Sequence, residues 1–147
     1  MTTIRGGGTS ADLVGAWQST YHYEKGTDYV DEDQNYGDLY IAFFNDGTWI
    51  ASEDEMNNGN FYFYAYDYGT WTVKNGEITM VSSDPGGDHG ETFTVKLNGS
   101  ELTIEENGYV REESSSYSYI DYDNPYYEKI IYTKLSSNPD SFEYYYD

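Results

Sequence analysis

The chain has no cysteine, and this absence excludes several kinds of chemistry. Disulfide bonds, zinc sites built from thiolates and catalysis by a thiol nucleophile all need the missing residue. Histidine is also scarce, with two among 147 residues, so a histidine base for a nucleophile has few candidates. The longest apolar run covers only 39–44, which is too short to cross a bilayer.

Basic residues are scarce as well. Seven lysines and arginines stand against 27 acidic residues, which gives a formal net charge of −20. This field repels the phosphates of nucleic acids and anionic lipid headgroups, so neither is expected as a partner. The charge is typical of a well-solvated surface, and it also suits cation binding or imitation of a polyanion. Solvation is the commoner reason for acidity and is our main interpretation.

Aromatic residues are abundant, since 19 tyrosines, three tryptophans and six phenylalanines make up 19% of the chain. Such side chains suit the half-buried surface of a β-sheet, and disordered acidic tails lack them. A chain of 147 residues is long enough to bury a core as one domain. The composition therefore predicts a folded, strand-rich domain.

Tight-turn signals punctuate the chain at Asp46-Gly47, Asn75-Gly76 and Asn98-Gly99. Such pairs supply the positive-φ residues of hairpin turns, and alternating apolar runs flank each of them. No helical periodicity longer than a turn or two occurs. The alternation predicts eight strands, at 14–24, 39–44, 48–55, 61–74, 77–82, 92–97, 101–106 and 128–135.

Two internal segments interrupt this pattern. The segment 25–38 is rich in acidic residues and is predicted to be a loop. The tyrosine- and serine-rich segment 109–127 is compatible with a long hairpin that extends the flanking strands, with its tip near Asp123-Asn124-Pro125. We therefore expect a flexible leader over 1–12, a barrel domain over 13–135 and a polar tail over 136–147.

Eight strands joined by hairpins bury their edges best by closing into a barrel. The predicted fold class is all-β, with an eight-stranded antiparallel up-and-down barrel. An open meander or a sandwich is the alternative.

Several short motifs, taken in order, resemble the lipocalin-like domains of secreted lipoproteins of Bacteroidetes. The run Leu13-Val14-Gly15-Ala16-Trp17 resembles their opening "LVGTW", and residues 40–49 resemble their "ITFNxDGTY" hairpin. Gly69-Thr70-Trp71, followed by 77–79, resembles a later strand pair of the same domains. The resemblance covers about 13–135. It implies a calycin-type barrel without shared catalytic residues, in which Trp17 plugs the closed end.

A barrel of this size either fills with its own side chains or holds one small ligand. If it holds an apolar ligand, we expect inward aromatic residues to line the site. These candidates are Trp49, Phe61, Phe63, Trp71 and Phe93. The alternative, that the same residues simply form the packed core, stays open.

The acidic segment 25–38 is the one candidate for a cofactor site, which would hold calcium. Asp31, Asp33 and Asn35 have the spacing of an EF-hand loop, but the glycine of the sixth position is replaced by Tyr36 and the glutamate of the twelfth by Ala42. The EF-hand pattern therefore fails. A solvated loop is the simpler interpretation, and the alternative is an irregular calcium site built from Asp28, Asp31, Asp33 and Asp38.

Tyrosines gather on two predicted surfaces. Alternate tyrosines of 61–74 form an outward ladder, which is best explained by cross-strand pairing. A second set lies in the inserted segment, where recognition of a protein or glycan is the better interpretation, because tyrosine offers a large contact area with a polar tip. This predicted partner-binding surface consists of Tyr117, Tyr119, Tyr122, Tyr126 and Tyr127.

These observations predict a non-catalytic binding module. It would bind a small apolar ligand in the barrel, or a protein or glycan partner through its tyrosine-rich acidic surface. The resemblance implies a periplasmic or cell-surface location, although the chain shows neither an export signal nor an acylatable cysteine. One alternative is an acidic decoy that mimics nucleic acid, which would be cytoplasmic if phage-encoded. A hydrolase with carboxylates at the barrel mouth is a third hypothesis.

Overall fold

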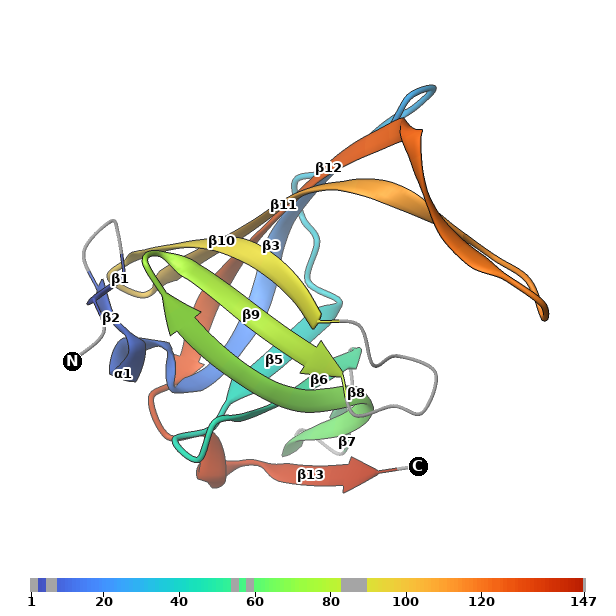
Figure 1. Ribbon diagram of the computed structural model, residues 1–147. Helices are drawn as coiled ribbons and strands as arrows, with labels where there is room; N and C mark the ends of the chain where they lie inside the picture. Colours follow the sequence, from blue (N-terminus) through green and yellow to red (C-terminus); the bar gives the residue numbers. More distant parts are fainter. Residues whose placement is uncertain (1–2, 5–7, 54–55, 58–59, 83–89, 147) are drawn as a thin grey trace.

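The computed structural model describes residues 3–4, 8–53, 56–57, 60–82 and 90–146 (Figure 1). Eight antiparallel strands, each paired with the next, form a barrel that closes where the last pairs with the first. They are β3 (Gly15–Lys25), β5 (Leu39–Phe43), β6 (Thr48–Glu53), β8 (Asn60–Lys74), β9 (Glu77–Ser82), β10 (Gly90–Asn98), β11 (Glu101–Glu113) and β12 (Ser118–Ser136). The predicted fold class is confirmed.

The tight turns form where the sequence predicts them. Between β8 and β9, Asn75 and Gly76 have φ angles of 53° and 80°, as a two-residue hairpin turn requires. Between β5 and β6, Gly47 has a φ of 87°. There the Asp46 carboxylate accepts hydrogen bonds from the backbone N and the Oγ1 of Thr48, at 3.0 and 2.6 Å. These turns set the register of the hairpins that build the barrel wall.

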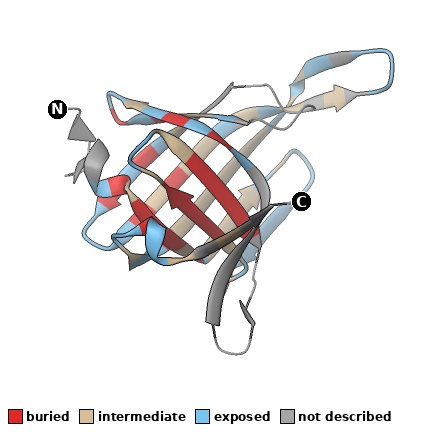
Figure 2. Ribbon diagram, turned by 90° about the horizontal axis from the view of Figure 1, so that it is seen from below, coloured by how far each residue is buried: buried red, intermediate tan, exposed pale blue. Residues whose placement is uncertain are grey.

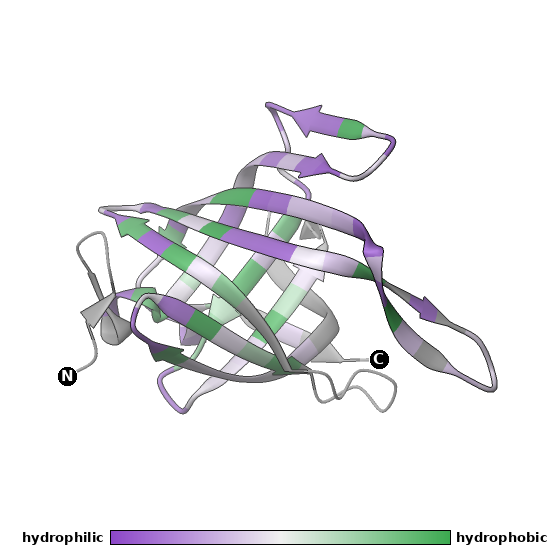
Figure 3. Ribbon diagram, turned by 45° about the horizontal axis from the view of Figure 1, so that its top comes forward, coloured by the Kyte–Doolittle hydropathy of each residue, from purple (hydrophilic) through white to green (hydrophobic). Residues whose placement is uncertain are grey.

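Alternating residues of these strands point inward and form one apolar core (Figures 2 and 3). Trp17, Phe43, Ile78 and Leu102 are fully buried, and each such side chain contributes about 1.5–3 kcal/mol to stability. A short helix, α1 (Ser10–Leu13), covers one end of the barrel. The Trp17 indole Nε1 donates to the carbonyl of Leu13 at 3.0 Å, so its polar atom is satisfied where it is buried.

Part of the predicted acidic loop is a strand. β4 (Val30–Asp33) pairs antiparallel with the second half of β3, at residues 22–25, which β5 does not reach. The prediction of a loop over 25–38 was therefore wrong for these four residues. β4 has the sequence Val30-Asp31-Glu32-Asp33, and all four residues are exposed. It therefore has no alternation of apolar and polar residues from which a strand could be predicted.

The C-terminal segment contributes a strand that the expectation of a polar tail missed. After the 3₁₀ turn η1 (Pro139–Ser141), β13 (Glu143–Tyr146) runs parallel to β8. Phe142 and Tyr144 pack against Ala16 and Tyr40 on the outer wall of the barrel. Shorter pairings join β1 (Thr3–Ile4) to β2 (Gly8–Thr9), and β7 (Met56–Asn57) to β8. No helix among the described residues has the length and apolar character to span a membrane.

Strands β11 and β12 continue beyond the barrel as a projecting two-stranded hairpin, residues 109–124, which we call the arm (Figure 1). The long hairpin is confirmed, but its predicted tip was wrong. The chain reverses at 114–117, where the N–H of Ser114 donates to the carbonyl of Tyr117 at 2.8 Å. The register jumps at the arm's base, where Tyr109 pairs with Pro125 and Val110 with Asp121. The turn-forming residues near 123 therefore lie at a bulge in β12, where the chain needs irregular conformations as it does in a hairpin turn.

Candidate functional site

Opposite the end that α1 covers, a row of acidic side chains crosses four neighbouring strands. Asp31 of β4 lies directly opposite Glu24 of β3, Glu24 opposite Glu128 of β12, and Glu128 opposite Glu106 of β11. Residues directly opposite each other on paired strands share one face of the sheet. These four carboxylates therefore form one continuous line, which we call the acid row.

The strand register places the acid row on the inner face of the barrel wall. Ile130 lies two residues from Glu128 along β12, and it is directly opposite His22 on one neighbouring strand and Ile104 on the other. Ile104 is a buried member of the core and Ile130 packs against it, so both point inward. Because side chains alternate along a strand, residues two positions away face the same side. The acid row thus lies immediately outside the core, at the end of the barrel away from α1, and we call this end the mouth.

His22, Glu24 and Glu128 form the most compact part of this mouth. The Nε2 of His22 lies 2.9 Å from the Oε2 of Glu128, and the side chains are 20% and 30% exposed. One ligand atom from each of the three residues lies within 4.8 Å of the other two. Burial raises the pKa of Glu128, the hydrogen bond to His22 lowers it, and Glu24 raises it further. A carboxylate pair in this setting is stabilised by a proton or a bound cation.

Tyrosine hydroxyls hold two acids of the row, Glu24 and Glu106, in place. Tyr29 donates to the Oε1 of Glu24 at 2.6 Å, and this bond is the main cause that raises the pKa of Tyr29 to about 12. Tyr126 donates to the Oε1 of Glu106 at 2.5 Å. A neutral hydroxyl orients a carboxylate without cancelling its charge. The mouth therefore suits a cationic group, and its imidazole and two carboxylates are also ligand types that divalent transition metals accept.

The structure places the predicted apolar lining mostly in the core. Trp49 and Trp71 are buried, and their indole N–H groups donate to the carbonyls of Thr70 and Phe44 at 2.9 and 3.2 Å. Phe93 is partly buried against the same core. Phe61 and Phe63 belong to β8, but their side chains lie outside the described residues. Ligand binding by these five residues stays a prediction.

The predicted tyrosine surface divides into two parts. Tyr117, Tyr119 and Tyr122 are exposed on the arm. Tyr126 and Tyr127 are partly buried at its base, where their hydroxyls donate to Glu106 and Glu105, each at 2.5 Å. Of the outward ladder on β8, Tyr68 is exposed, whereas the side chains of its other tyrosines lie outside the described residues.

The four candidate calcium ligands are all exposed. Asp31 and Asp33 alternate on β4 and share the inner face with Glu24 and His22. Asp28 and Asp38 lie in the segments on either side of β4. An irregular calcium site made from these four residues stays a prediction.

Sequence reasoning missed Glu24, Glu106 and Glu128. Each lies two positions beyond an inward residue, namely His22, Ile104 and Ile130. Continuing the inward alternation of β11 and β12 past Ile104 and Ile130 would have placed Glu106 and Glu128 on one face. Glu24 could not be placed in this way, because the register of β3 against β12 shifts between Ser19 and Tyr21, and Glu24 therefore does not continue the alternation of Trp17. The pairing with β4, which adds Asp31 to the row, had no such signal.

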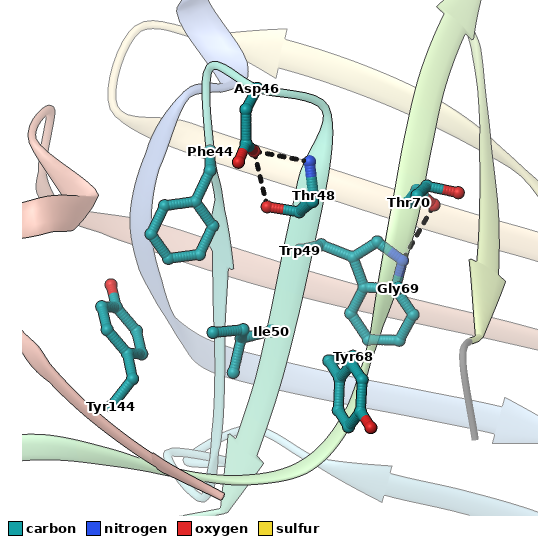
Figure 4. Close-up of a pocket in the computed structure, with 9 residues that line it drawn as sticks. All are labelled: Phe44, Asp46, Thr48, Trp49, Ile50, Tyr68, Gly69, Thr70 and Tyr144. Atoms are coloured by element: carbon teal, nitrogen blue, oxygen red, sulfur yellow. Dashed lines mark hydrogen bonds between the residues drawn. The ribbon is translucent and has the colours of Figure 1, made fainter.

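A groove of about 520 Å³ lies on the outer wall between β6, β8 and the C-terminal segment (Figure 4). Ile50 lies between Tyr68 on one side and the contacting rings of Phe44 and Tyr144 on the other, whose centroids are 5.2 Å apart. Hydrogen bonds from Thr48 hold the Asp46 carboxylate in the turn and lower its pKa. The polar groups of Asp46 and Thr48 at the rim of this groove therefore bond to each other and stabilise the β5–β6 turn.

Comparisons with known proteins found two similar solved structures and one matching domain family. A lipocalin-like protein from Bacteroides uniformis is 18% identical, with a TM-score of 0.49, over 84% of this chain and 99% of that chain. An uncharacterized protein from Bacteroides eggerthii is 18% identical, with a TM-score of 0.48, over 84% of this chain and 100% of that chain. No curated protein matches the chain. The lipocalin-like domain profile matches residues 13–104, more than half of the chain, and the protein therefore belongs to the lipocalin-like domain family, as its motifs predicted.

Proposed function

We propose that this protein is a binding module for a small organic cation with an apolar body, held at the open end of the barrel. The acid row on the inner face is the observation that carries this proposal. Membership of the lipocalin-like family supports the general role of a binding barrel. The proposal changes the expected ligand from a purely apolar molecule to one with a positively charged end.

The electrostatics of the mouth favour such a ligand. Like charges directly opposite each other on paired strands destabilise a sheet, by roughly 0.2–1 kcal/mol a pair. A cation placed between Glu24 and Glu128 removes that repulsion and gains attraction in a partly desolvated setting. The net charge of −20 also raises the concentration of cations near the surface.

The apolar part of the ligand has a matching surface beneath the acids. Ile130 lies two residues from Glu128, and Ile104 is its cross-strand partner. Val95 pairs with Ile104, and Phe93 lies two residues before Val95 on the same face of β10. Phe93 is partly buried against the core. A ligand whose charged end lies on the acid row thus has its body directed toward these side chains.

Three probes with the same chain and different headgroups test the proposal by titration calorimetry: decylammonium, decanol and decanoate. We expect decylammonium to bind about tenfold more tightly than decanol, which corresponds to about 1.4 kcal/mol, and decanoate to bind least. Equal affinity for all three, or a preference for decanoate, contradicts the proposal.

Matched variants locate the site. The double variant Glu24→Gln/Glu128→Gln keeps the shape of the mouth and removes two charges, so we expect it to lose the preference for the ammonium headgroup. Glu105→Gln is the control, because Glu105 lies on the outer face of β11 and pairs with Lys96 at 3.3 Å. If both variants weaken decylammonium binding equally, the general charge of the protein is responsible and the mouth is not the site.

We also propose that the module is non-catalytic and acts at the bacterial envelope. The resemblance of its motifs to domains of secreted lipoproteins supports this location. Fractionation of the native organism with an antibody against the folded domain tests it, and recovery from the cytoplasm would favour the acidic decoy instead.

A further inference from the structure

We propose that the arm is a docking surface for an extended basic segment of a partner protein. Lysine or arginine side chains of that segment would lie over the paired tyrosines of the arm, next to its carboxylates. This surface is separate from the barrel mouth and does not depend on the ligand proposed for it.

Large apolar side chains on the arm are unusually exposed. Tyr117, Tyr119 and Tyr122 are 56%, 52% and 69% exposed, and Ile120 and Tyr109 are also exposed. A two-stranded hairpin is only marginally stable in water by itself, and this one projects away from the barrel (Figure 1). Clustered exposed aromatic residues on such a projection are typical of a surface that a partner covers.

The tyrosines form two pairs, and the pair near the tip lies among acids. The rings of Tyr117 and Tyr119 stack with centroids 5.7 Å apart, whereas Tyr109 and Tyr122 meet edge to face at 5.1 Å. Glu112 lies directly opposite Tyr119, and Asp121 follows two residues later on the same face. A cation placed here is attracted by the faces of the rings and also by the negative charge of the neighbouring carboxylate.

The arm also offers backbone hydrogen-bonding groups along its sides. Within the described residues, β10 pairs with β11 only as far as Glu105, and β3 pairs with β12 only from Tyr127 onward. The two strands of the arm therefore pair with each other alone. An extended peptide can add to such an edge as a further strand, which supplies affinity through main-chain hydrogen bonds.

Charge decides which occupant fits. Residues 109–124 contain four acidic residues and one basic residue, in a chain whose net charge is −20. A second copy of the chain would bring the same excess of negative charge to the contact, and nucleic acids or anionic membranes would be repelled. A segment rich in lysine or arginine is complementary to this surface.

The test uses the full chain and a fluorescein-labelled peptide that alternates lysine and threonine, with binding followed by fluorescence anisotropy. We expect the double variant Tyr117→Ser/Tyr119→Ser to weaken binding about tenfold, because it removes two exposed cation–π contacts. The variant keeps the net charge, so attraction by charge alone would be unaffected. Tyr68→Ser is the control, since Tyr68 is an exposed tyrosine on the barrel wall.

Loss of affinity in the arm variant but not in the control supports the proposal. Unchanged affinity in the arm variant, an equal loss in Tyr68→Ser, or equal binding of a glutamate–threonine peptide overturns it. Sedimentation of the unliganded protein gives a separate check. A dimer that the arm variant breaks apart would identify a second copy as the occupant and would also overturn the proposal.

Discussion

The two ends of the barrel are built on the same strands, yet they contain opposite kinds of side chain. At the closed end, β3 and β12 contribute Trp17 and Tyr132, both buried in the core. At the open end, the same strands contribute Glu24 and Glu128 to the acid row. Alternation along a strand determines which side chains point inward, and residue type then determines whether an inward position stabilises the fold or can bind a ligand.

The closed end satisfies its polar groups within the protein, whereas the open end keeps charges close together. The indole of Trp17 donates to Leu13, and the Lys134 ammonium lies 5.2 Å from the centroid of its ring. At the mouth, Glu128 remains next to another carboxylate in a partly buried setting. Retaining such repulsion costs stability, which is common at functional sites. We therefore expect changes at the closed end to affect folding and changes at the open end to affect binding.

The largest effect should follow from Trp17→Ala. Removing a fully buried indole leaves a cavity beneath α1 and should lower the free energy of unfolding by about 3–5 kcal/mol, measured by urea denaturation. Trp17→Phe is the matched control, since it keeps an aromatic ring and loses the hydrogen bond to Leu13. We expect it to cost less. A loss below about 1 kcal/mol in Trp17→Ala would show that the closed end is not the main source of stability.

A smaller effect is expected where β3 enters the barrel. Gly15 has a φ of 153°, and a Cβ there would lie 2.6 Å from the carbonyl oxygen of Ser136. Gly15→Ala should therefore destabilise the fold by about 2 kcal/mol in thermal or urea unfolding, because it adds a contact with backbone to a strained conformation. Gly99→Ala is the control. Gly99 also has a positive φ, 63°, but open space around it, so we expect a cost of about 1 kcal/mol. Equal costs would show that the approach of Ser136 is unimportant.

Local sequence rules predicted the barrel because they act residue by residue along each strand. Asn75-Gly76 adopts the conformation that the hairpin turn requires, and the apolar alternation correctly places residues such as Ile78 and Leu102 in the core. The edge strands β4 and β13 were not predicted, because their pairing depends on where other strands end. β4 pairs with β3 beyond the end of β5, and β13 pairs with β8 where the pairing of β6 ends. That information lies in the tertiary structure, and neither short segment carries an inward apolar pattern of its own.

The mouth could be predicted only in part for a related reason. Glu106 and Glu128 continue the inward alternation of Ile104 and Ile130, whereas a register shift between Ser19 and Tyr21 means that Glu24 does not continue the alternation of Trp17. In addition, 106 residues separate His22 from its partner Glu128. Only the closure of β12 onto β3 brings these groups within 2.9 Å of each other. Among 27 acidic residues, nothing in one sequence shows which carboxylates the pairing of distant strands aligns in one row.

The smallest effect, and the most specific to the open end, is a dependence of stability on pH. The folded-state pKa of Glu128 is raised above its ordinary value of 4.5, mainly by burial, so its contribution to stability is present below that pH and is lost as the pH rises through the folded-state pKa. Glu128→Gln should therefore gain stability relative to the wild type above about pH 4.5, by roughly 0.2–1 kcal/mol, the size of one cross-strand repulsion.

Glu105 on the outer face is the matched control. Its pKa is lowered, first by the hydrogen bond from Tyr127 and then by Lys96, so its contribution is present above 4.5 and is lost as the pH falls. Glu105→Gln should accordingly be less stable than the wild type near neutral pH, and the difference should close in acid. Urea denaturation of the three proteins between acid and neutral pH measures both slopes. Slopes of the same sign would mean that the two faces of the wall do not differ in their electrostatics, and the contrast between a stabilising outer face and a strained mouth would fail.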